Sequence, residues 1–377
     1  MDTGTILEAQ ARRAATPRRT LRVALVCSAR NGTYGAVQSM LTLAEELRLQ
    51  GHDVHMVTFK GRGLGDVARS RGFQVHEIAV RLKVDPFAIL SLARVLRQNE
   101  IDVVHSHLST SALIGGLAAR IGGVPSLATV HGLSSKGSFI TSGHLLAVSN
   151  DVRRHLVDQG IRPEKVTVVL NGISITPVAT VADRLAARAE LGLAPDDRVV
   201  GSTVRLTPAK GAHHALAAFG RVAKEVPSAR LVLFGDGEAR NELERQARDL
   251  GVRDMVVFAG YRSDVRALLP ALDVFVFPSL KEAMGIAIVE AMLAGLPVVA
   301  HDVGGIPEVV TREMGYLVAA GDEHSMAQHL SDLLYEDRLR QRMGQAARDR
   351  AVSEFDAVKM GARTVDAYSQ AISRHGK

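Results

Sequence analysis

Short apolar runs alternate with amphipathic segments along most of the chain, and this alternation constrains the fold more than any other feature. In the first half, the expected strands and helices lie at 21–28, 36–50, 54–59, 102–105, 113–121, 126–130 and 144–149. Strands that alternate with helices of about 10–15 residues form parallel sheets covered by helices on both faces. The first half therefore predicts an α/β domain built on a parallel sheet.

The same alternation restarts after a polar, proline-containing connection and fills the second half. Its expected elements lie at 198–202, 212–225, 230–234, 238–250, 255–258, 263–269, 273–277, 286–293 and 297–300. Two successive units of nearly equal length predict two Rossmann-like domains with parallel sheets facing across a cleft. We place a mobile basic tail at 1–20, the first domain at 21–175, a linker at 176–197, the second domain at 198–355, and a helix that crosses back at 356–377.

The composition is that of a globular protein long enough for two hydrophobic cores. The chain has 377 residues, of which 46% are hydrophobic and 23% charged. A single cysteine, Cys27, excludes an internal disulfide framework and suits a reducing compartment, and we expect it in the core. No apolar run approaches the about 18–20 residues of a membrane helix, and the N-terminus lacks the apolar centre of a secretion signal. These features predict a cytoplasmic protein, free or peripheral at the inner face of a membrane.

Basic residues are concentrated in the first half of the chain. Residues 1–184 contain 22 basic and 14 acidic side chains, whereas residues 185–377 contain 24 and 26. A basic half can face an anionic membrane surface or an anionic acceptor, and it is equally compatible with an Arg-rich composition that has no partner. The chain has no Trp and only 4% aromatic residues, so we do not expect a nucleic-acid partner.

Two glutamates eight residues apart surround a predicted strand-to-helix turn. The strand at 273–277 ends at Pro278, so Glu282 falls in the loop and Glu290 on the helix at 286–293. In open α/β sheets, ligands bind beyond the carboxyl ends of the strands. Carboxylates at such a place accept hydrogen bonds from hydroxyl groups. The pair therefore predicts a site for a hydroxyl-rich ligand such as a sugar nucleotide.

Two cations follow the first strand of the second half. Arg205 and Lys210 lie between the strand at 198–202 and the helix at 212–225. A guanidinium group binds phosphate oxygens in a bidentate manner and an ammonium group acts as a point charge, so the pair suits a diphosphate. Two cations in a loop are otherwise ordinary surface charges, and it is their position at a strand's carboxyl end that favours a binding role.

Other turns carry weaker signals. Gly35, which opens a helix, and Gly235 each let a ligand approach the backbone, although a simple tight turn explains either glycine equally well. His131 follows the strand at 126–130 and suits a contact with a sugar hydroxyl or a structural role. His105 and His107 share a strand but have no nearby carboxylate or thiol, and the chain has no Asp-x-Asp motif. We therefore expect no metal site and no cofactor.

Taken together, these residues resemble a retaining glycosyltransferase of family 4, which has the two-domain GT-B architecture. The resemblance runs from about residue 21 to residue 355. Its most specific parts are an E-x7-E motif with Glu282 and Glu290, an R-x4-K-G loop with Arg205 and Lys210, and the segment 297–308. Supporting parts lie at 51–54, 102–107, 147–149 and 171–172.

The resemblance implies a function for each domain. The second domain would bind a nucleotide diphosphate sugar, and the first a saccharide or lipid-linked acceptor. Arg205 and Lys210 would hold the diphosphate, Glu290 the ribose hydroxyls and Glu282 the hydroxyls of the donor sugar. Further donor contacts implied by the resemblance come from His131, Gly35, Met284, Gly285 and Ile286.

The resemblance also implies a mechanism and a setting. The anomeric configuration would be retained without a metal ion, because the leaving phosphate takes the acceptor proton on the face where the acceptor attacks. Assembly of cell-surface polysaccharide, lipopolysaccharide or glycolipid is the expected setting. A nucleotide-sugar epimerase and a noncatalytic sugar-nucleotide binding protein are the alternatives on the same fold. Ala283-Met284 replaces the Gly-Phe or Ser-Phe that commonly follows the first glutamate, so the donor sugar cannot be carried over.

Overall fold

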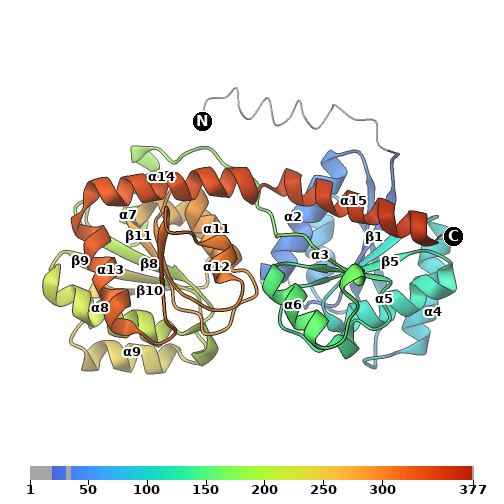
Figure 1. Cartoon of the computed structure of the whole chain (residues 1–377), viewed down its shortest axis with the longest axis horizontal. Coiled ribbons are helices and arrows are strands. Elements are labelled where there is room, and N and C mark those ends of the chain that lie inside the picture. The colour runs from blue at the N-terminus through green and yellow to red at the C-terminus, as the bar shows by residue number, and fades with distance from the viewer. Residues whose placement is uncertain (1–18, 31–34, 376–377) are drawn as a thin grey trace. The chain divides into compact units, whose positions relative to one another are not determined.

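The computed structural model describes residues 19–30 and 35–375, which fall into two compact α/β units (Figure 1). The first unit contains the described residues up to Ser174 together with those from Phe355 onward, and the second is Ile175–Glu354. The predicted pair of Rossmann-like domains is therefore confirmed, as is the return of the C-terminal segment to the first domain.

The first unit is built on a parallel sheet with the strand order β3-β2-β1-β4-β5-β6-β7. Its strands are β1 (Arg22–Cys27), β2 (Asp53–Phe59), β3 (Gln74–Ile78), β4 (Val103–His107), β5 (Ser126–Val130), β6 (His144–Ala147) and β7 (Val166–Val168). Its α-helices are α2 (Gly35–Leu49), α3 (Leu64–Ser70), α4 (Pro86–Gln98), α5 (Ser109–Gly122), α6 (Asn150–Asp158) and α15 (Ala357–His375).

Both faces of this sheet are covered, which explains why β1 is apolar at nearly every position. Val23 and Leu25 belong to one apolar core, whereas Ala24 and Val26 belong to another. Successive side chains of a strand point to opposite faces, so the two cores lie on the two sides of the sheet. Cys27 is buried in the first of these cores, as predicted, and burial raises the pKa of its thiol to about 11.

Helix α15 packs beside α2 in the first unit (Figure 1). A Cβ atom at Gly361 would lie 2.6 Å from Cγ of Glu46, so glycine permits the close approach of the two helices. Two segments far apart in the sequence pair at the start of α15. Ile173 N donates to Phe355 O at 2.8 Å, and Ala357 N donates to Ile173 O at 3.0 Å. These bonds fix the C-terminal helix to the first unit.

The second unit is also built on a parallel sheet, with the order β10-β9-β8-β11-β12-β13. Its strands are β8 (Arg198–Thr203), β9 (Ala229–Phe234), β10 (Val256–Gly260), β11 (Val274–Phe277), β12 (Val298–His301) and β13 (Gly315–Val318). Its α-helices are α7 (Val181–Glu190), α8 (Ala212–Glu225), α9 (Arg240–Asp249), α10 (Val265–Leu268), α11 (Ile286–Leu293), α12 (Ile306–Val309), α13 (Glu323–Tyr335) and α14 (Asp337–Glu354).

The segment interpreted as a linker, 176–197, contains helix α7 and lies within the second unit. Two arginines of this helix form ion pairs with the buried Asp273: Arg184 at 2.7 Å and Arg188 at 3.0 Å. The polar composition that suggested a linker therefore includes the side chains that attach α7 to the start of β11.

The topology of the second sheet brings distant loops together. Strand β8 lies between β9 and β11, so the chain runs first to one side of β8 and later returns to the other. The connections that follow β8 and β11 lead to opposite edges of the sheet, so the carboxyl ends of these two strands form a switch point. Open α/β sheets bind ligands at such a point. Among the described residues, no helix combines the length and apolarity needed to cross a membrane.

Candidate active site

The loops that follow β8 and β11 are in direct contact at the switch point. Leu280 N donates to Ala209 O at 3.0 Å, which ties the two loops together through their backbones. Lys210 Nζ donates to Glu282 Oε2 at 2.6 Å, and both side chains are partly buried, with 24% and 16% of their surfaces exposed. The structure therefore pairs Lys210, predicted to bind the diphosphate, with Glu282, predicted to bind the donor sugar.

Glycine at position 211 allows this close contact. Gly211 has φ +68°, and a Cβ atom there would lie 2.0 Å from Pro278 O in the loop after β11. That distance is far below any van der Waals contact, so a side chain would force the two loops apart. Gly211 also precedes α8 directly, which places Lys210 at the N-terminal end of that helix.

A third loop joins these two. Gly305 N, in the loop after β12, donates to Glu282 O at 3.1 Å. The other carboxylate oxygen of Glu282 accepts from Ala283 N at 3.1 Å. Glu282 is thus held by its backbone and by both carboxylate oxygens, which fixes its orientation before any ligand binds.

Helix α11 begins directly behind Glu282. Gly285 is its N-cap residue, with φ +88° and no side chain to bond the first-turn amides. Amide groups at a helix N-terminus, together with the helix dipole, favour anions. The N-terminus of α11, at Ile286, therefore suits a phosphate group beside the Lys210–Glu282 pair.

Glu290 lies on α11, four residues or about one helical turn beyond Ile286. Burial raises the pKa of its carboxyl group, and the Arg266 guanidinium on α10 opposes part of this shift. Without a ligand, the charged carboxylate is therefore costly to the fold. A hydroxyl-bearing ligand that donates to it would recover part of that cost.

Arg205 and Gly235 have different surroundings. Arg205 is exposed just beyond the carboxyl end of β8. Gly235 has φ +132°, and a Cβ atom there would lie 2.0 Å from Val204 O. The absence of a side chain at Gly235 is thus explained by the packing of two loops, without a ligand.

Met284 lies in the structure where a pocket role for its side chain is not evident. Only 1% of this residue is exposed, so its side chain packs inside the second unit. Its backbone precedes the N-cap of α11, which leaves the amide near the helix N-terminus. The Met284 side chain therefore supports the loop from inside the unit and is not available to contact a ligand at the surface.

A histidine cluster near the loop that carries Lys210 was not predicted from the sequence. His214 Nδ1 lies 2.9 Å from Glu323 Oε1, and its ring centroid lies 5.4 Å from that of the fully buried His301. His301 Nε2 accepts from Gly321 N at 3.2 Å. The only sequence signal was the position of His301 at the end of an apolar strand.

The first unit contains a second histidine cluster, at the carboxyl ends of β4 and β5. His107 Nδ1 and His131 Nε2 lie 2.9 Å apart. Behind them, His105 bonds Thr129 Oγ1 and the Tyr368 hydroxyl of α15, each at 2.7 Å. His131 was predicted as a site residue, but neither its contact with His107 nor the bond from His105 to the C-terminal helix was predicted.

Burial keeps these histidines neutral. It lowers the pKa of His105 to about 3 and the pKa of His131 to about 4, and it also lowers the pKa of His107. Neutral imidazoles suit hydrogen bonding to hydroxyl groups. No group of three or more His, Cys, Asp or Glu side chains that could hold a metal ion occurs in the part of the chain that the structure describes.

The lowered pKa values predict that the first unit loses stability in acid. An unfolded histidine has a pKa of about 6.5, so below that pH the unfolded chain binds protons that the folded cluster does not. Stability should therefore fall as the pH drops from about 6.5 towards the folded pKa values of about 4 and 3. Urea unfolding between pH 7 and pH 5 measures this loss, and replacement of His105 by Gln should reduce its slope.

Gly35 opens helix α2 and is exposed. Its position at a helix N-terminus agrees with a place near an anion. The four residues before it, 31–34, lie outside the described residues, as does most of the predicted basic tail.

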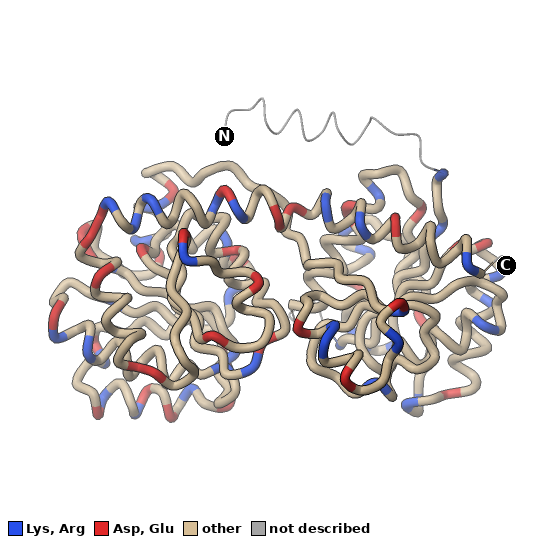
Figure 2. The backbone as a smooth tube through the Cα atoms, in the orientation of Figure 1, with Lys and Arg blue, Asp and Glu red and all other residues tan. Residues whose placement is uncertain are grey.

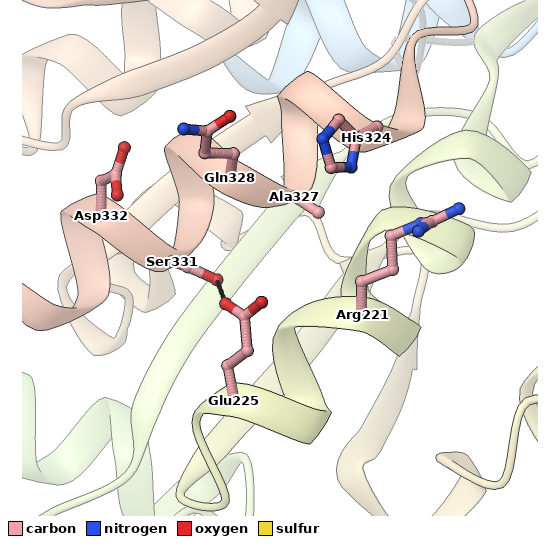
Figure 3. Close-up of a pocket in the computed structure, with 7 residues that line it drawn as sticks. All are labelled: Arg221, Glu225, His324, Ala327, Gln328, Ser331 and Asp332. Carbon is pink, nitrogen blue, oxygen red and sulfur yellow. Dashed lines mark hydrogen bonds between the residues drawn. The ribbon is translucent and has the colours of Figure 1, made fainter.

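A pocket of about 400 Å³ lies elsewhere, between α8 and α13. Figure 3 shows Glu225 and Ser331 facing each other across it, with the Ser331 hydroxyl donating to Glu225 Oε2 at 2.7 Å. None of the predicted site residues lines this pocket. We therefore do not assign this pocket to the site.

Comparison with known proteins agrees with this geometry. The family profile described as "Glycosyltransferase Family 4" matches residues 33–176, and that of "Glycosyl transferases group 1" matches residues 183–350. The UDP-Gal:alpha-D-GlcNAc-diphosphoundecaprenol alpha-1,3-galactosyltransferase of Escherichia coli is 28% identical over 316 residues, which cover 77% of this chain and 80% of that protein. The N-acetyl-alpha-D-glucosaminyl L-malate synthase of Bacillus anthracis is 26% identical over 364 residues, or 90% and 94% of the two chains.

Solved structures show the same fold. HepE of Anabaena, determined in complex with UDP and glucose, superposes with a TM-score of 0.82 at 23% identity, covering 93% of this chain and 99% of that one. The two parallel α/β units thus have the GT-B fold. The chain belongs to glycosyltransferase family 4.

Proposed function

We propose that this protein transfers a sugar from a nucleotide diphosphate sugar to a saccharide or lipid-linked acceptor, with the donor bound by the second unit. The observation that carries the proposal is the Lys210–Glu282 ion pair at the switch point, next to the uncapped N-terminus of α11. A diphosphate and a neighbouring sugar are the ligands whose chemistry matches a cation, an anion-binding helix end and a carboxylate in one place.

The named relatives support this class of substrate. The Escherichia coli relative has a UDP-sugar donor and a diphosphoundecaprenol acceptor in its name, and HepE binds UDP and glucose. Uridine diphosphate sugars are therefore the first donors to test. Assembly of cell-surface polysaccharide, lipopolysaccharide or glycolipid is the setting that we propose.

The ion pair explains how the site is held before its donor binds. In the absence of a ligand, Lys210 and Glu282 neutralise each other. When a donor binds, the diphosphate takes the ammonium group of Lys210, and the sugar hydroxyls donate to the released carboxylate of Glu282. Arg205 adds a second cation for the charge that grows on the leaving diphosphate.

We further propose that transfer retains the anomeric configuration and needs neither a metal ion nor a cofactor. Arg205, Lys210 and the first-turn amides of α11 supply the positive charge that the diphosphate requires, and the leaving phosphate accepts the acceptor proton. His131 of the first unit contributes a neutral hydrogen-bonding group for a sugar hydroxyl. Gly35, at the start of α2, would approach the diphosphate through its backbone.

Product stereochemistry and chelation test these two features. We expect proton NMR of the product to show the same anomeric configuration as the α-linked donor, and we expect EDTA to leave the rate unchanged. An inverted product would refute retention. Loss of activity in EDTA that added Mg²⁺ restores would refute metal independence.

Glu290 provides a test of the ribose contact. Replacing it by Gln removes a partly buried charge whose pKa is raised, so the free protein should melt about 1–3 °C higher at pH 8. The raised pKa means that this gain grows as the pH rises through the folded value and disappears in acid. The same variant should bind nucleoside diphosphates about tenfold more weakly, because an amide is a poorer acceptor for a diol. Calorimetry measures both quantities, and unchanged affinity would contradict the assignment.

An epimerase on the same fold is the second candidate, and a noncatalytic binding protein is the third. Both would bind the donor at the same residues. An epimerase would isomerise the donor without an acceptor, whereas a binding protein would show no turnover with any acceptor. Chromatography of the donor after incubation with and without an acceptor separates all three.

We also propose that the protein works at the inner face of the membrane, where a lipid-linked acceptor is available. The excess of basic residues in the first half of the sequence supports this location. No partner among nucleic acids is proposed.

A further inference from the structure

Four large apolar side chains are exposed together in the first unit, on the loop before α4 and on its first turns. Phe87 has 79% of its surface exposed and Leu82 has 64%, and Val84 and Leu90 are also exposed. A single exposed apolar side chain is ordinary in a globular protein, but a group within nine residues marks an interaction surface.

The fold does not need these side chains. Helix α4 already contributes Ala88, Ile89 and Leu92, with residues 93 and 96, to the apolar core of the first unit. Phe87 and Leu90 lie on its opposite side, in line with Arg94 one turn further along. Helix α4 therefore has two apolar faces, one buried in the core and one exposed.

The loop before α4 is held in place by a helix cap. Asp85 Oδ1 accepts from Phe87 N at 3.0 Å, and Asp85 Oδ2 accepts from Arg81 N at 2.8 Å. This buried carboxylate fixes the loop against the first turn of the helix. Leu82 and Val84 thereby lie on a backbone segment that is tied to the first turn of the helix carrying Phe87, and this order lowers the entropic cost of binding.

The exposed charges of the segment that carries this surface have one sign. Every exposed charged residue from 79 to 98 is a cation, and the only carboxylate in the stretch is the buried Asp85. These cations are Arg81, Lys83, Arg94 and Arg97. Elsewhere, each unit carries charges of both signs (Figure 2). The α4 patch is hereafter this surface: Leu82, Val84, Phe87 and Leu90 with Arg81, Lys83 and Arg94.

We propose that the α4 patch docks the protein on an anionic lipid bilayer. Exposed phenylalanine and leucine enter the boundary between headgroups and acyl chains, while flanking cations are attracted to anionic lipids. A second copy of the chain fits less well, because a symmetric contact would bring the cations of both patches together. The purpose of this docking, access to a lipid-linked acceptor, rests on the proposed function. The observations that support it come from the first unit alone.

The absence of Trp from the chain allows a direct probe of this contact. In the full-length Phe87→Trp variant, the fluorescence of the single tryptophan reports on position 87. We expect its emission to shift to shorter wavelength with vesicles of phosphatidylcholine that contain about 30% phosphatidylglycerol, and less so with pure phosphatidylcholine. An Ile140→Trp variant, at an exposed apolar site of the same unit outside the patch, should show no shift.

Flotation of the full-length protein with the same anionic vesicles tests both parts of the patch. Phe87→Ser with Leu90→Ser should lower binding at least about tenfold, because it removes the inserted groups. Arg81→Gln with Lys83→Gln and Arg94→Gln should lower binding at least about tenfold at about 50 mM salt, and wild-type binding should weaken at about 500 mM salt. The matched controls are Ile140→Ser with Val181→Ser, and Lys224→Gln with Arg245→Gln and Arg248→Gln, all exposed outside the patch. They should bind as wild type does.

The outcomes separate this proposal from the proposed function. Every patch variant should keep the melting temperature and the nucleoside diphosphate affinity of the wild type. Absence of vesicle binding, or binding that the patch variants leave unchanged, overturns the docking surface even if the donor site is real. A wild-type dimer in light scattering that Phe87→Ser with Leu90→Ser converts to monomer overturns it in favour of self-association. Failure of every nucleotide to bind would count against the proposed function and leave the vesicle result standing.

Discussion

Replacing Lys210 with Met is expected to lower kcat/KM for sugar transfer by about 10²–10⁴-fold. The substitution removes a positive charge aimed at the diphosphate whose charge grows in the transition state. It also leaves the partly buried carboxylate of Glu282 without the partner that lies 2.6 Å away in the free protein. The fold should tolerate the change, because the methionine side chain has a similar length and the loop is held by backbone bonds such as that from Leu280 N to Ala209 O.

A neighbouring lysine supplies the control for this prediction. Lys281 is exposed and lies next to Glu282 in the sequence, so Lys281→Met changes the net charge equally without touching the ion pair. Its kcat/KM should stay within about threefold of the wild type. The double variant of Lys210→Met with Glu282→Gln should lose less than the product of the two single losses, because the two residues act as a pair. Equal losses at positions 210 and 281 would refute a specific role for Lys210.

Replacing Gly211 with Ala is the second change with a large expected effect. A methyl group at this position meets Pro278 O at 2.0 Å, and the backbone has φ +68°. We expect a loss of about 2–4 kcal/mol in the free energy of unfolding, from backbone strain and from separation of the two loops. Activity should fall by at least about tenfold even at temperatures where the variant is folded, because Lys210 and Glu282 are carried by the separated loops.

Gly251 distinguishes the clash from the backbone strain. It has φ +71°, and a Cβ atom there would have no neighbour within 4 Å, so Gly251→Ala carries the strain alone. Its cost should be about 1 kcal/mol, without loss of activity. Chemical unfolding and steady-state kinetics of both variants give the comparison. If Gly211→Ala were as stable and active as Gly251→Ala, the contact between the loops could not be what positions the site.

The local pattern of the sequence predicted those elements that have clear boundaries. Helix α11 begins and ends where expected, at Ile286 and Leu293, because Gly285 and Gly295 both adopt positive φ values next to it. The segment 181–190 was interpreted as part of a linker because it follows a proline-containing connection and precedes the first clear strand of the second half. It is a helix because ion pairs to Asp273, which is 85 and 89 residues away in sequence, hold it on the sheet.

The site was predictable in its residue types and not in its contacts. Cations and carboxylates beyond strand ends indicated a diphosphate and hydroxyl groups. The direct bond between Lys210 and Glu282 spans 72 residues and follows from the strand order, which local periodicity does not encode. The same holds for the contact between His107 and His131, which depends on the pairing of β4 with β5.

The role expected for Gly235 shows how one residue type serves two purposes. Glycine at a strand-to-helix turn permits a ligand to approach the backbone, and it equally permits another loop to do so. Here the neighbour is Val204 O. Only the three-dimensional arrangement distinguishes a glycine that admits a ligand from one that admits the protein's own chain.

The most direct test of the central claim is the thermal stability of the full-length protein with uridine, guanosine and adenosine diphosphates and their sugar derivatives. We predict that at least one base series raises the melting temperature by about 5 °C or more near saturation, since a ligand that binds only the folded state stabilises it. The increase should be lost in the Lys210→Met variant. A folded protein whose melting temperature rises with none of these nucleotides would contradict a nucleotide-sugar site in the second unit.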